Sequence, residues 1–441
     1  MFRSKILPDC DPIASGPATL AADPGDLRRR VLAGAIGNTV EWYDFAIYGY
    51  FAPLIGRAFF PNSDRAAQLM AAYAVFALAF LFRPLGSVVF GHIADRVGRR
   101  AALVLSVGVM AASTFAVGML PAYDSIGLVA PALLLLLRAL QGLSVGGEFT
   151  TSMAFIAEQS PPKWRGFNTS LASTSAVLGL VIGSAFSAVL QGALGQAAMA
   201  AWGWRLPFLF GLMLGVICFA IRRTLLADLP ATPPQERGER LPIVEAVTAE
   251  GGAILRTFLT SSLHGILFYV GFVYLLTFEQ RYDGLPPAIT LWFMTLSQLL
   301  MAVLFPLFGA LSDRIGRLRV MQASAVATFV LAWPLFRLLS QHNPVIVLLG
   351  QVAYTTLFCA YVGPVPAMLT EQFATRTRAS GAALSYNAAM ALFGGTTPVI
   401  VVWLTAVTGR PLIVAAWLML GTVLGVIGVR LSDDRTGLPL R

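Results

Sequence analysis

Twelve long apolar stretches run through this sequence, and they constrain its fold more than any other feature. A helix needs about 20 mostly apolar residues to cross a bilayer, and each stretch is long enough. Only 12% of the residues are charged, whereas soluble domains have about 25%. We therefore predict an all-α membrane protein. The expected spans lie near residues 31–56, 68–93, 101–120, 127–156, 168–192, 204–224, 255–280, 288–311, 319–339, 344–370, 379–406 and 411–430.

The basic residues predict how the chain is oriented. Of the 31 Lys and Arg residues, 23 fall on one side of the expected spans, six on the other side and two inside spans. Such an excess of positive charge marks cytoplasmic loops, so we expect both termini in the cytoplasm and the protein in the inner membrane. The basic clusters are short and lie between apolar runs, which argues against a nucleic-acid partner. We expect a monomer in the lipid bilayer.

The two halves of the chain repeat one another. The pattern G-x-x-x-D-R-x-G-R occurs at residues 91–99 and again at 309–317, an offset of 218. The pair Glu158-Gln159 recurs as Glu371-Gln372, an offset of 213. Parallel repeats with a site between them are a transporter architecture. We expect an N-terminal tail, a six-helix bundle, a central loop, a second, pseudo-symmetric six-helix bundle and a C-terminal tail, over residues 1–27, 28–224, 225–254, 255–430 and 431–441.

Short motifs narrow the class further. Besides the repeated pattern, the sequence contains GNTVEWYDF at 37–45, FRPLG at 82–86, RALQG at 138–142, GGEF at 146–149 and WRLPF at 204–208. In this order, the set resembles the major facilitator superfamily and, within it, the metabolite:H⁺ symporters. Proline/betaine, α-ketoglutarate, citrate and shikimate carriers belong to that family. The resemblance covers residues 31–430 and implies two bundles that rock about a central site.

Acidic residues inside the first span are candidates for proton coupling. Charged side chains inside a membrane are costly and mark functional sites. Glu41 and Asp44 are three residues apart and share a helix face that Tyr48 continues. Low dielectric and a second carboxylate both favour the protonated form. The alternative is a structural ion pair with Arg83 or Arg138. Glu148 is a further candidate acid, unless its two preceding glycines serve helix packing alone.

Two arginines inside spans, together with Tyr48 and Gln141, are candidates for substrate binding. Arg138 lies near the middle of the fourth span, with Gln141 on the same face, and Arg83 lies in the second span. Arginine stays charged and forms a planar fork to carboxylates. The alternative is a permanent ion pair with an acid of the same half. Tyr386 and Asn387 in the eleventh span are candidate ligands from the second half, whereas His264 in the seventh span is typical of a core residue.

Charged residues at the cytoplasmic ends of the spans predict a gate. Asp95 with Arg99, and Glu158 with Arg165, place opposite charges at neighbouring span ends. By resemblance to the family, these residues form a salt-bridged latch that holds the outward-facing state. The second half mirrors them with Asp313, Arg317, Glu371 and Arg378. The alternative is that these charges only fix the topology.

The function that the sequence favours is proton-coupled symport of a small organic acid. Arg83 and Arg138 favour a di- or tricarboxylate, and a proline- or betaine-type zwitterion is the alternative. No phosphate-binding G-x-x-x-x-G-K-[ST] loop is present. Three histidines and three cysteines without ligand spacing predict no metal site, no cofactor and no enzyme activity. A membrane sensor that does not transport is the alternative from another class.

Overall fold

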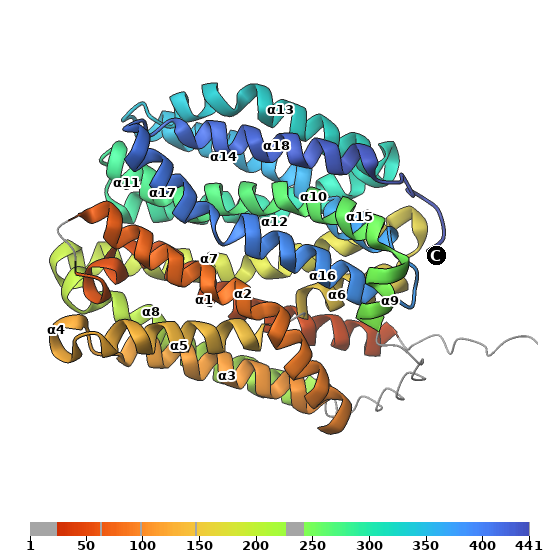
Figure 1. Ribbon diagram of the computed structural model, residues 1–441, viewed down its shortest axis with the longest axis horizontal. Coiled ribbons are helices and arrows are strands. Elements are labelled where there is room, and N and C mark those ends of the chain that lie inside the picture. Colours follow the sequence, from red (N-terminus) through yellow and green to blue (C-terminus); the bar gives the residue numbers. More distant parts are fainter. Residues whose placement is uncertain (1–23, 62–63, 98, 146–147, 226–241, 441) are drawn as a thin grey trace, which may run out of the picture.

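A computed structural model describes residues 24–61, 64–97, 99–145, 148–225 and 242–440 of the protein. Side chains in short stretches beside the gaps, including those of Asp95, Arg99 and Glu148, lie outside the described residues. Within the described part, every regular element is helical (Figure 1).

The N-terminal half contains eight α-helices and two short 3-10 turns among the described residues. They are α1 (Pro24–Phe59), α2 (Arg65–Val97), α3 (Arg99–Met119), α4 (Tyr123–Ile126), α5 (Val129–Ser144), α6 (Glu148–Gln159), η1 (Pro162–Trp164), α7 (Arg165–Ala201), η2 (Gly203–Arg205) and α8 (Leu206–Leu225).

The C-terminal half begins with a short helix in the expected central loop, where Pro242 occupies a first-turn position that suits proline. Its elements are α9 (Pro242–Ala249), α10 (Gly251–Tyr269), η3 (Val270–Tyr274), α11 (Leu275–Tyr282), α12 (Pro287–Ile315), α13 (Arg317–Leu338), α14 (Pro344–Val362), α15 (Val365–Glu371), α16 (Arg378–Ala389), η4 (Met390–Gly394), α17 (Thr397–Thr408) and α18 (Ile413–Leu431).

Ten of the twelve expected membrane spans are confirmed. Ten helical segments of the described chain are long and apolar enough to cross a membrane. The shorter apolar stretch Val104–Met119 overlaps the expected third span. Helix α1, which contains the acids Glu41 and Asp44, overlaps the expected first span. The fifth span runs further than expected, to Ala201, because helix resumes after a break at Gly195, where φ is 71°. The outer surface is apolar, as in Val303 and Val330, each 65% exposed. The protein is therefore a multi-pass membrane protein.

The two halves lie side by side along their whole length (Figure 1). Between them, α7 and α12 form the most extensive contact of any two helices, and α2 packs on α17. Gly309 of the repeated motif permits this approach, because a Cβ there would lie 2.6 Å from the Gly166 carbonyl oxygen. The span of α10 and α11 is 94% buried, whereas the other nine are 33–56% buried. This span therefore lies at the centre of the molecule.

Two π-helical turns interrupt spans of the C-terminal half. The turn η3 separates α10 from α11, and η4 separates α16 from α17. π-turns are rare and often occur at functional sites. Tyr269 lies beside both: it directly precedes η3, and its ring lies 2.8 Å from the position of a Cβ at Gly394 in η4. The two turns thus meet around one buried aromatic ring that faces the N-terminal half.

The two ends of the helical bundle carry different groups. The end that carries Glu158, Arg165, Asp313, Arg317, Glu371 and Arg378 is called the latch face, and these six residues are called the latch. The opposite end, with α4 and the C-terminal end of α11, is called the far face. In Figure 1 the latch face lies at the right, beside the C-terminus, and the far face at the left.

Candidate functional site

Asp44 and Arg138 form a buried ion pair at the centre of the N-terminal half. Nη1 of Arg138 lies 2.8 Å from Oδ2 of Asp44, and both side chains are 0–1% exposed. Gln141 and Thr114 each donate to the other oxygen, Oδ1, at 2.7 Å. Arg138 also donates to Oε1 of Gln141 at 2.8 Å. The carboxylate of Asp44 is thus fully bonded, whereas Nε and Nη2 of Arg138 have no hydrogen-bond partner.

A second ion pair joins Glu41 to Arg83. Nη2 of Arg83 donates to Oε1 of Glu41 at 3.1 Å, and both side chains are buried. Glu41 also borders a small cavity, which is lined by Val40, Ser106, Val107, Met110, Ser144 and Val145. Both arginines therefore have an acidic partner on α1, as the structural alternative expected.

Glycines of the sequence motifs bring the two arginine-bearing helices together. A Cβ at Gly142 would lie 2.1 Å from the Ala79 carbonyl oxygen, and one at Gly86 would lie 2.0 Å from that of Leu143. Only glycine allows such a close approach of backbones. The contact of α2 with α5 places Arg83 and Arg138 on the same side of α1. The FRPLG and RALQG motifs thus have a packing role as well as a charge.

Both guanidinium groups also lie over aromatic rings. The Arg138 carbon Cζ is 4.1 Å from the ring centre of Tyr48, and Arg83 Cζ is 4.4 Å from that of Phe80. The Tyr48 hydroxyl donates to the Ala72 carbonyl, which fixes the ring beneath Arg138. A cation is attracted to an aromatic face at these distances. The expected face of Glu41, Asp44 and Tyr48 therefore exists, and it faces the two arginines.

Aromatic side chains fill the boundary between the halves. The Trp42 and Phe268 rings are 5.1 Å apart, those of Phe80 and Tyr269 are 5.3 Å apart, and those of Phe149 and Tyr386 are 5.6 Å apart. We call this set the aromatic seam: Trp42, Phe76, Phe80 and Phe149 from the N-terminal half, with Phe268, Tyr269 and Tyr386 from the C-terminal half. The Trp42 indole nitrogen has no hydrogen-bond partner. The seam directly adjoins the two ion pairs.

The candidate residues of the C-terminal half do not take part in the two ion pairs. Tyr386 belongs to the seam and also packs against His264, with ring centres 5.6 Å apart. His264 is buried, and its Nδ1 has no hydrogen-bond partner. Asn387 is 6% exposed. Glu148, the third candidate acid, has its side chain outside the described residues.

The latch residues pair across the two halves. Arg165 of α7 bonds to Glu371 of α15 at 2.9 Å, and Arg378 of α16 bonds to Glu158 of α6 at 2.6 Å. The sequence pattern predicts a pair of Glu158 with Arg165 inside one half. The structure instead exchanges the partners, because the repeat brings equivalent helix ends of opposite halves together. Asp95 and Arg99, the remaining expected gate residues, lie outside the described side chains.

Glu371 and Asp313 connect further groups of the latch. Arg317 binds Glu371 with two nitrogens, at 2.7 and 2.9 Å, and Asp313 at 2.9 Å. Asp313 also accepts the backbone N–H groups of Gly166 and Phe167, at 2.8 and 2.9 Å. These two residues lie in the first turn of α7, where a carboxylate is favourable because the positive end of the helix dipole lies there. Asp313 thus ties the C-terminal half to α7 of the other half.

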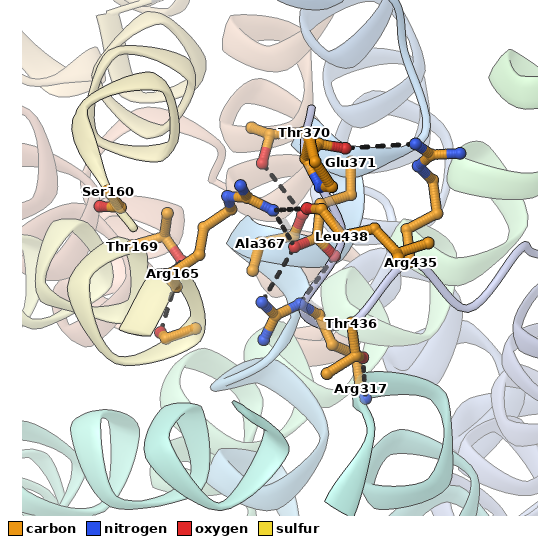
Figure 2. A network of polar contacts seen from close by, with 12 residues as sticks. Ser160, Arg165, Thr169, Arg317, Ala367, Thr370, Glu371, Arg435, Thr436 and Leu438 are labelled. Atoms are coloured by element: carbon orange, nitrogen blue, oxygen red, sulfur yellow. Dashed lines mark hydrogen bonds and ion pairs between the residues drawn. The ribbon is translucent and has the colours of Figure 1, made fainter. Parts of the chain in front are cut away.

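The C-terminal tail lies across the latch (Figure 2). The Leu438 carbonyl accepts a hydrogen bond from Arg165 at 3.1 Å, and the Thr436 hydroxyl accepts one from the Arg317 backbone N–H at 3.0 Å. Gln372 donates to the Asp433 carbonyl at 2.9 Å. The tail was expected only as a short end after the last span. It instead bonds to residues of both halves.

The halves also touch nearer the far face. The Tyr73 and Thr277 hydroxyls lie 2.9 Å apart, and Nε2 of Gln298 donates to the Tyr50 hydroxyl at 2.5 Å. Ser184 of α7 donates to Oε1 of the same glutamine at 2.7 Å. Polar contacts therefore join the halves on both sides of the central ion pairs.

Sequence reasoning missed two acids near the far face, Glu279 and Asp283. Both are buried, at 0% and 7% exposure. Glu279 is the second-to-last residue of the expected seventh span, where a charged side chain is usually attributed to the membrane interface. The signal that could have found it is the spacing: Glu279 and Asp283 are four residues apart and share a helix face.

Comparisons with known proteins agree with this architecture. A family model described as Major Facilitator Superfamily matches residues 34–398. The glycine betaine/proline/ectoine/pipecolic acid transporter OusA of Dickeya dadantii is 34% identical, and the match covers 98% of this chain and 88% of that protein. The proline/betaine transporter of Escherichia coli is also 34% identical, over 93% of this chain and 84% of that protein.

Solved structures show the same fold at low sequence identity. A D-xylose-proton symporter has a TM-score of 0.74 at 18% identity, and the match covers 94% of this chain and 100% of that one. A partially occluded, inward-open xylose transporter of E. coli has a TM-score of 0.74 at 17% identity, over 94% of this chain and 99% of that one. These relatives and neighbours are transporters and not enzymes. The two relatives are named as transporters of proline and betaine, and OusA also of ectoine and pipecolic acid.

Proposed function

Because the chain belongs to the major facilitator superfamily, we propose that it is a proton-coupled symporter of small zwitterionic osmolytes of the proline and betaine type. Two relatives with such substrates match it over almost its whole length. A zwitterion needs a cation for its carboxylate and an anion or aromatic face for its ammonium group. The ion pairs and the aromatic seam offer both within one site.

Arg138 is the observation that carries this proposal. One nitrogen of its guanidinium binds Asp44, while Nε and Nη2 have no partner. A substrate carboxylate would bond to these free donors. The seam would hold the ammonium group by cation–π attraction, which contributes up to about 2 kcal/mol at a desolvated site. The second carboxylate of a dicarboxylate would instead face these aromatic rings, because the other buried arginine, Arg83, is already paired with Glu41. This arrangement is unfavourable for a second negative charge.

Asp44 would couple substrate binding to the proton. When Asp44 is charged, it occupies Arg138 and neutralises it. When Asp44 takes up a proton, it no longer neutralises Arg138, and a substrate carboxylate on Nε and Nη2 becomes the counter-ion of the guanidinium group. Proton and substrate would therefore bind together, which is the condition for symport. Glu41 with Arg83 would form a second pair of the same kind beside it.

We also propose that the latch face is cytoplasmic. The excess of basic residues lies at this end, as it does in cytoplasmic loops. The latch would then close the cytoplasmic side and favour the outward-facing or occluded state. Its release would open the site to the cytoplasm as the halves rock.

Uptake by the purified protein in liposomes tests the substrate and the coupling together. With a pH gradient that is acidic outside, labelled proline and glycine betaine should accumulate, and collapse of the gradient should abolish accumulation. Unlabelled osmolytes should compete for uptake, whereas citrate and α-ketoglutarate should not. Competition by the organic acids alone would overturn the substrate, and accumulation that ignores the pH gradient would overturn the coupling.

Arg138→Lys should weaken substrate binding strongly although it conserves the charge. Lysine has no planar fork and cannot bind Asp44 and a second carboxylate in the same geometry. Loss of one charge-assisted hydrogen bond costs about 2 kcal/mol, or about thirtyfold in affinity. Calorimetric titration with glycine betaine measures this loss. Arg205→Lys is the control, because Arg205 lies at the far-face end of α8 over Trp204. Equal affinity of Arg138→Lys and the parent would make Arg138 structural.

Deletion of residues 434–441 should favour opening of the latch face. Arg165 and Arg317 would each lose one hydrogen bond to the tail. A hydrogen bond contributes about 1 kcal/mol, so the population should shift about tenfold or more for the two together. Spin-label distances across the latch face report the shift. Leu438→Ala is the control, since it removes an exposed side chain and keeps the carbonyl. An unchanged distance distribution after the deletion would contradict a closing role of the tail.

A further inference from the structure

Glu279 is a buried carboxylate that is used by neither ion pair of the central site. Oε1 accepts a hydrogen bond from Nε2 of Gln351 at 2.7 Å, and Oε2 has no hydrogen-bond partner. Ser297 donates to Oε1 of Gln351 at 3.1 Å, which directs the amide NH₂ toward Glu279. Within the described chain, no Lys, Arg or His forms an ion pair with Glu279. A buried carboxylate without a cation is costly in its charged form.

Asp283 lies one turn further along the same helix face, nearer the far face. Its side chain is buried, and neither carboxylate oxygen has a hydrogen-bond partner. Nδ1 of His342 lies 3.8 Å from Oδ1 of Asp283, and the His342 side chain is 67% exposed. A row of titratable groups thus leads inward from water, through His342 and Asp283 to Glu279.

Among the described residues, no Lys or Arg forms an ion pair with Glu279 or Asp283. On α11 itself, Arg281 is exposed and lies over the Tyr282 ring. Arg337 at the end of α13 and Arg57 at the end of α1 are also exposed. Deeper in α1, Glu41 and Asp44 are occupied by their arginines. The packed helices α12 and α14 contribute the uncharged groups Ser297, Gln298 and Gln351. Burial raises the pKa of Asp283 to about 6, although His342 lowers it.

The same turn of α12 connects this region to the other half of the protein. Ser297 orients Gln351, and the next residue, Gln298, bonds to Tyr50 and Ser184 of the N-terminal half. Separation of the halves at Tyr50 would therefore act on the turn that holds the hydrogen-bond donor of Glu279. Hydrogen bonds thus connect Glu279 and the contact between the halves through one turn of α12.

We propose that Glu279 and Asp283 form a proton-binding site in the C-terminal half, with exposed His342 as its access from the far face. The proposal rests on the proposed proton symport, because this site would bind the transported proton before the two halves move. The transfer is balanced: a hydronium ion protonates the exposed imidazole of His342 and leaves as water, and the Nδ1 proton passes to an Asp283 oxygen and then to Oε2 of Glu279. His342 is then neutral again, and Asp283 is again a carboxylate.

Glu279→Gln tests the site, because it removes the titratable group and keeps an acceptor for Gln351. Accumulation of labelled proline under a pH gradient should fall about tenfold or more, while exchange of labelled for unlabelled proline persists. Asp124→Asn, an exposed acid of α4 near the far face, is the matched control and should behave as the parent. Asp283→Asn should shift the midpoint of the external-pH profile of uptake away from about pH 6.

Infrared titration of the purified full chain gives a readout that needs no transport. The parent should show protonated-carboxyl bands that are absent from the Glu279→Gln protein, and the Asp124→Asn protein should retain them. Unchanged bands, or unchanged proton-driven accumulation in Glu279→Gln, would overturn the site. If the parent shows the bands but no proton-driven uptake, the proposed function fails while proton binding at Glu279 stands.

Discussion

Replacement of Asp44 by asparagine should abolish proton-driven accumulation of substrate. The variant keeps the size of the side chain and the contacts with Gln141 and Thr114, but removes the group that would exchange a proton for Arg138. A gradient of one pH unit supplies about 1.4 kcal/mol per proton, which sustains about tenfold accumulation. In Asp44→Asn, labelled proline should only equilibrate, while exchange across the membrane persists because Arg138 remains available. Liposome uptake with an imposed pH gradient measures both quantities.

A matched change in the same network separates the acid from its surroundings. Thr114→Ser keeps the hydroxyl that donates to Asp44 at 2.7 Å and should accumulate substrate as the parent does. Glu41→Gln should lower accumulation in the same direction, since the Glu41–Arg83 pair repeats the arrangement. Full accumulation by both amide variants would make the two ion pairs structural, as the alternative interpretation of the sequence holds.

The spans were predictable because lipid imposes a simple rule on the sequence. Each helix must present about 20 apolar residues, and the observed helices begin and end within a few residues of the expected spans. The α7 extension was missed because Gly195 looks like a helix end, although the helix resumes after it. The π-turns at Val270–Tyr274 and Met390–Gly394 were not predictable, since their residues are ordinary apolar ones and nothing in the sequence shows that both turns lie beside Tyr269.

Ion-pair partners were predictable by type but not by identity. Asp44 and Arg138 lie near the middle of their spans, so an ion pair between them was one of few possibilities. Among the latch residues, three carboxylates and three arginines are equally close in the sequence pattern. Glu158 pairs with Arg378, and Glu371 pairs with Arg165, so each carboxylate binds an arginine of the opposite half. This choice of partners follows only from how the two halves pack together. For Glu279 the residue type is evident from the sequence, but its burial is not. It lies near the end of a span, where a shift of one helical turn places a side chain either at the membrane interface or in the protein core.

Removal of the Glu371 carboxylate should open the latch face more than any other single change at the latch. Glu371 accepts bonds from Arg165 and from two nitrogens of Arg317, and all three side chains are 1–2% exposed. Without it, Arg165 keeps only the Leu438 carbonyl, while Arg317 keeps Asp313. Removal of one partner from a buried pair costs about 3–5 kcal/mol. The closed state should therefore lose a factor of about a hundred to several thousand in population relative to the open state.

Spin labels at Lys163 and Arg314, in a background without cysteine, measure the opening directly. Both side chains are exposed at the latch face, one in each half, so Glu371→Gln should lengthen the distance between their labels. Arg376→Gln is the control, because it removes an ion pair with Glu245 whose side chains are 57% and 29% exposed. Pairs of this kind contribute about 0–1 kcal/mol, so the distance should not change. An unchanged distance in Glu371→Gln would mean that the latch fixes topology only and that another contact, such as Tyr73 with Thr277, holds the halves together.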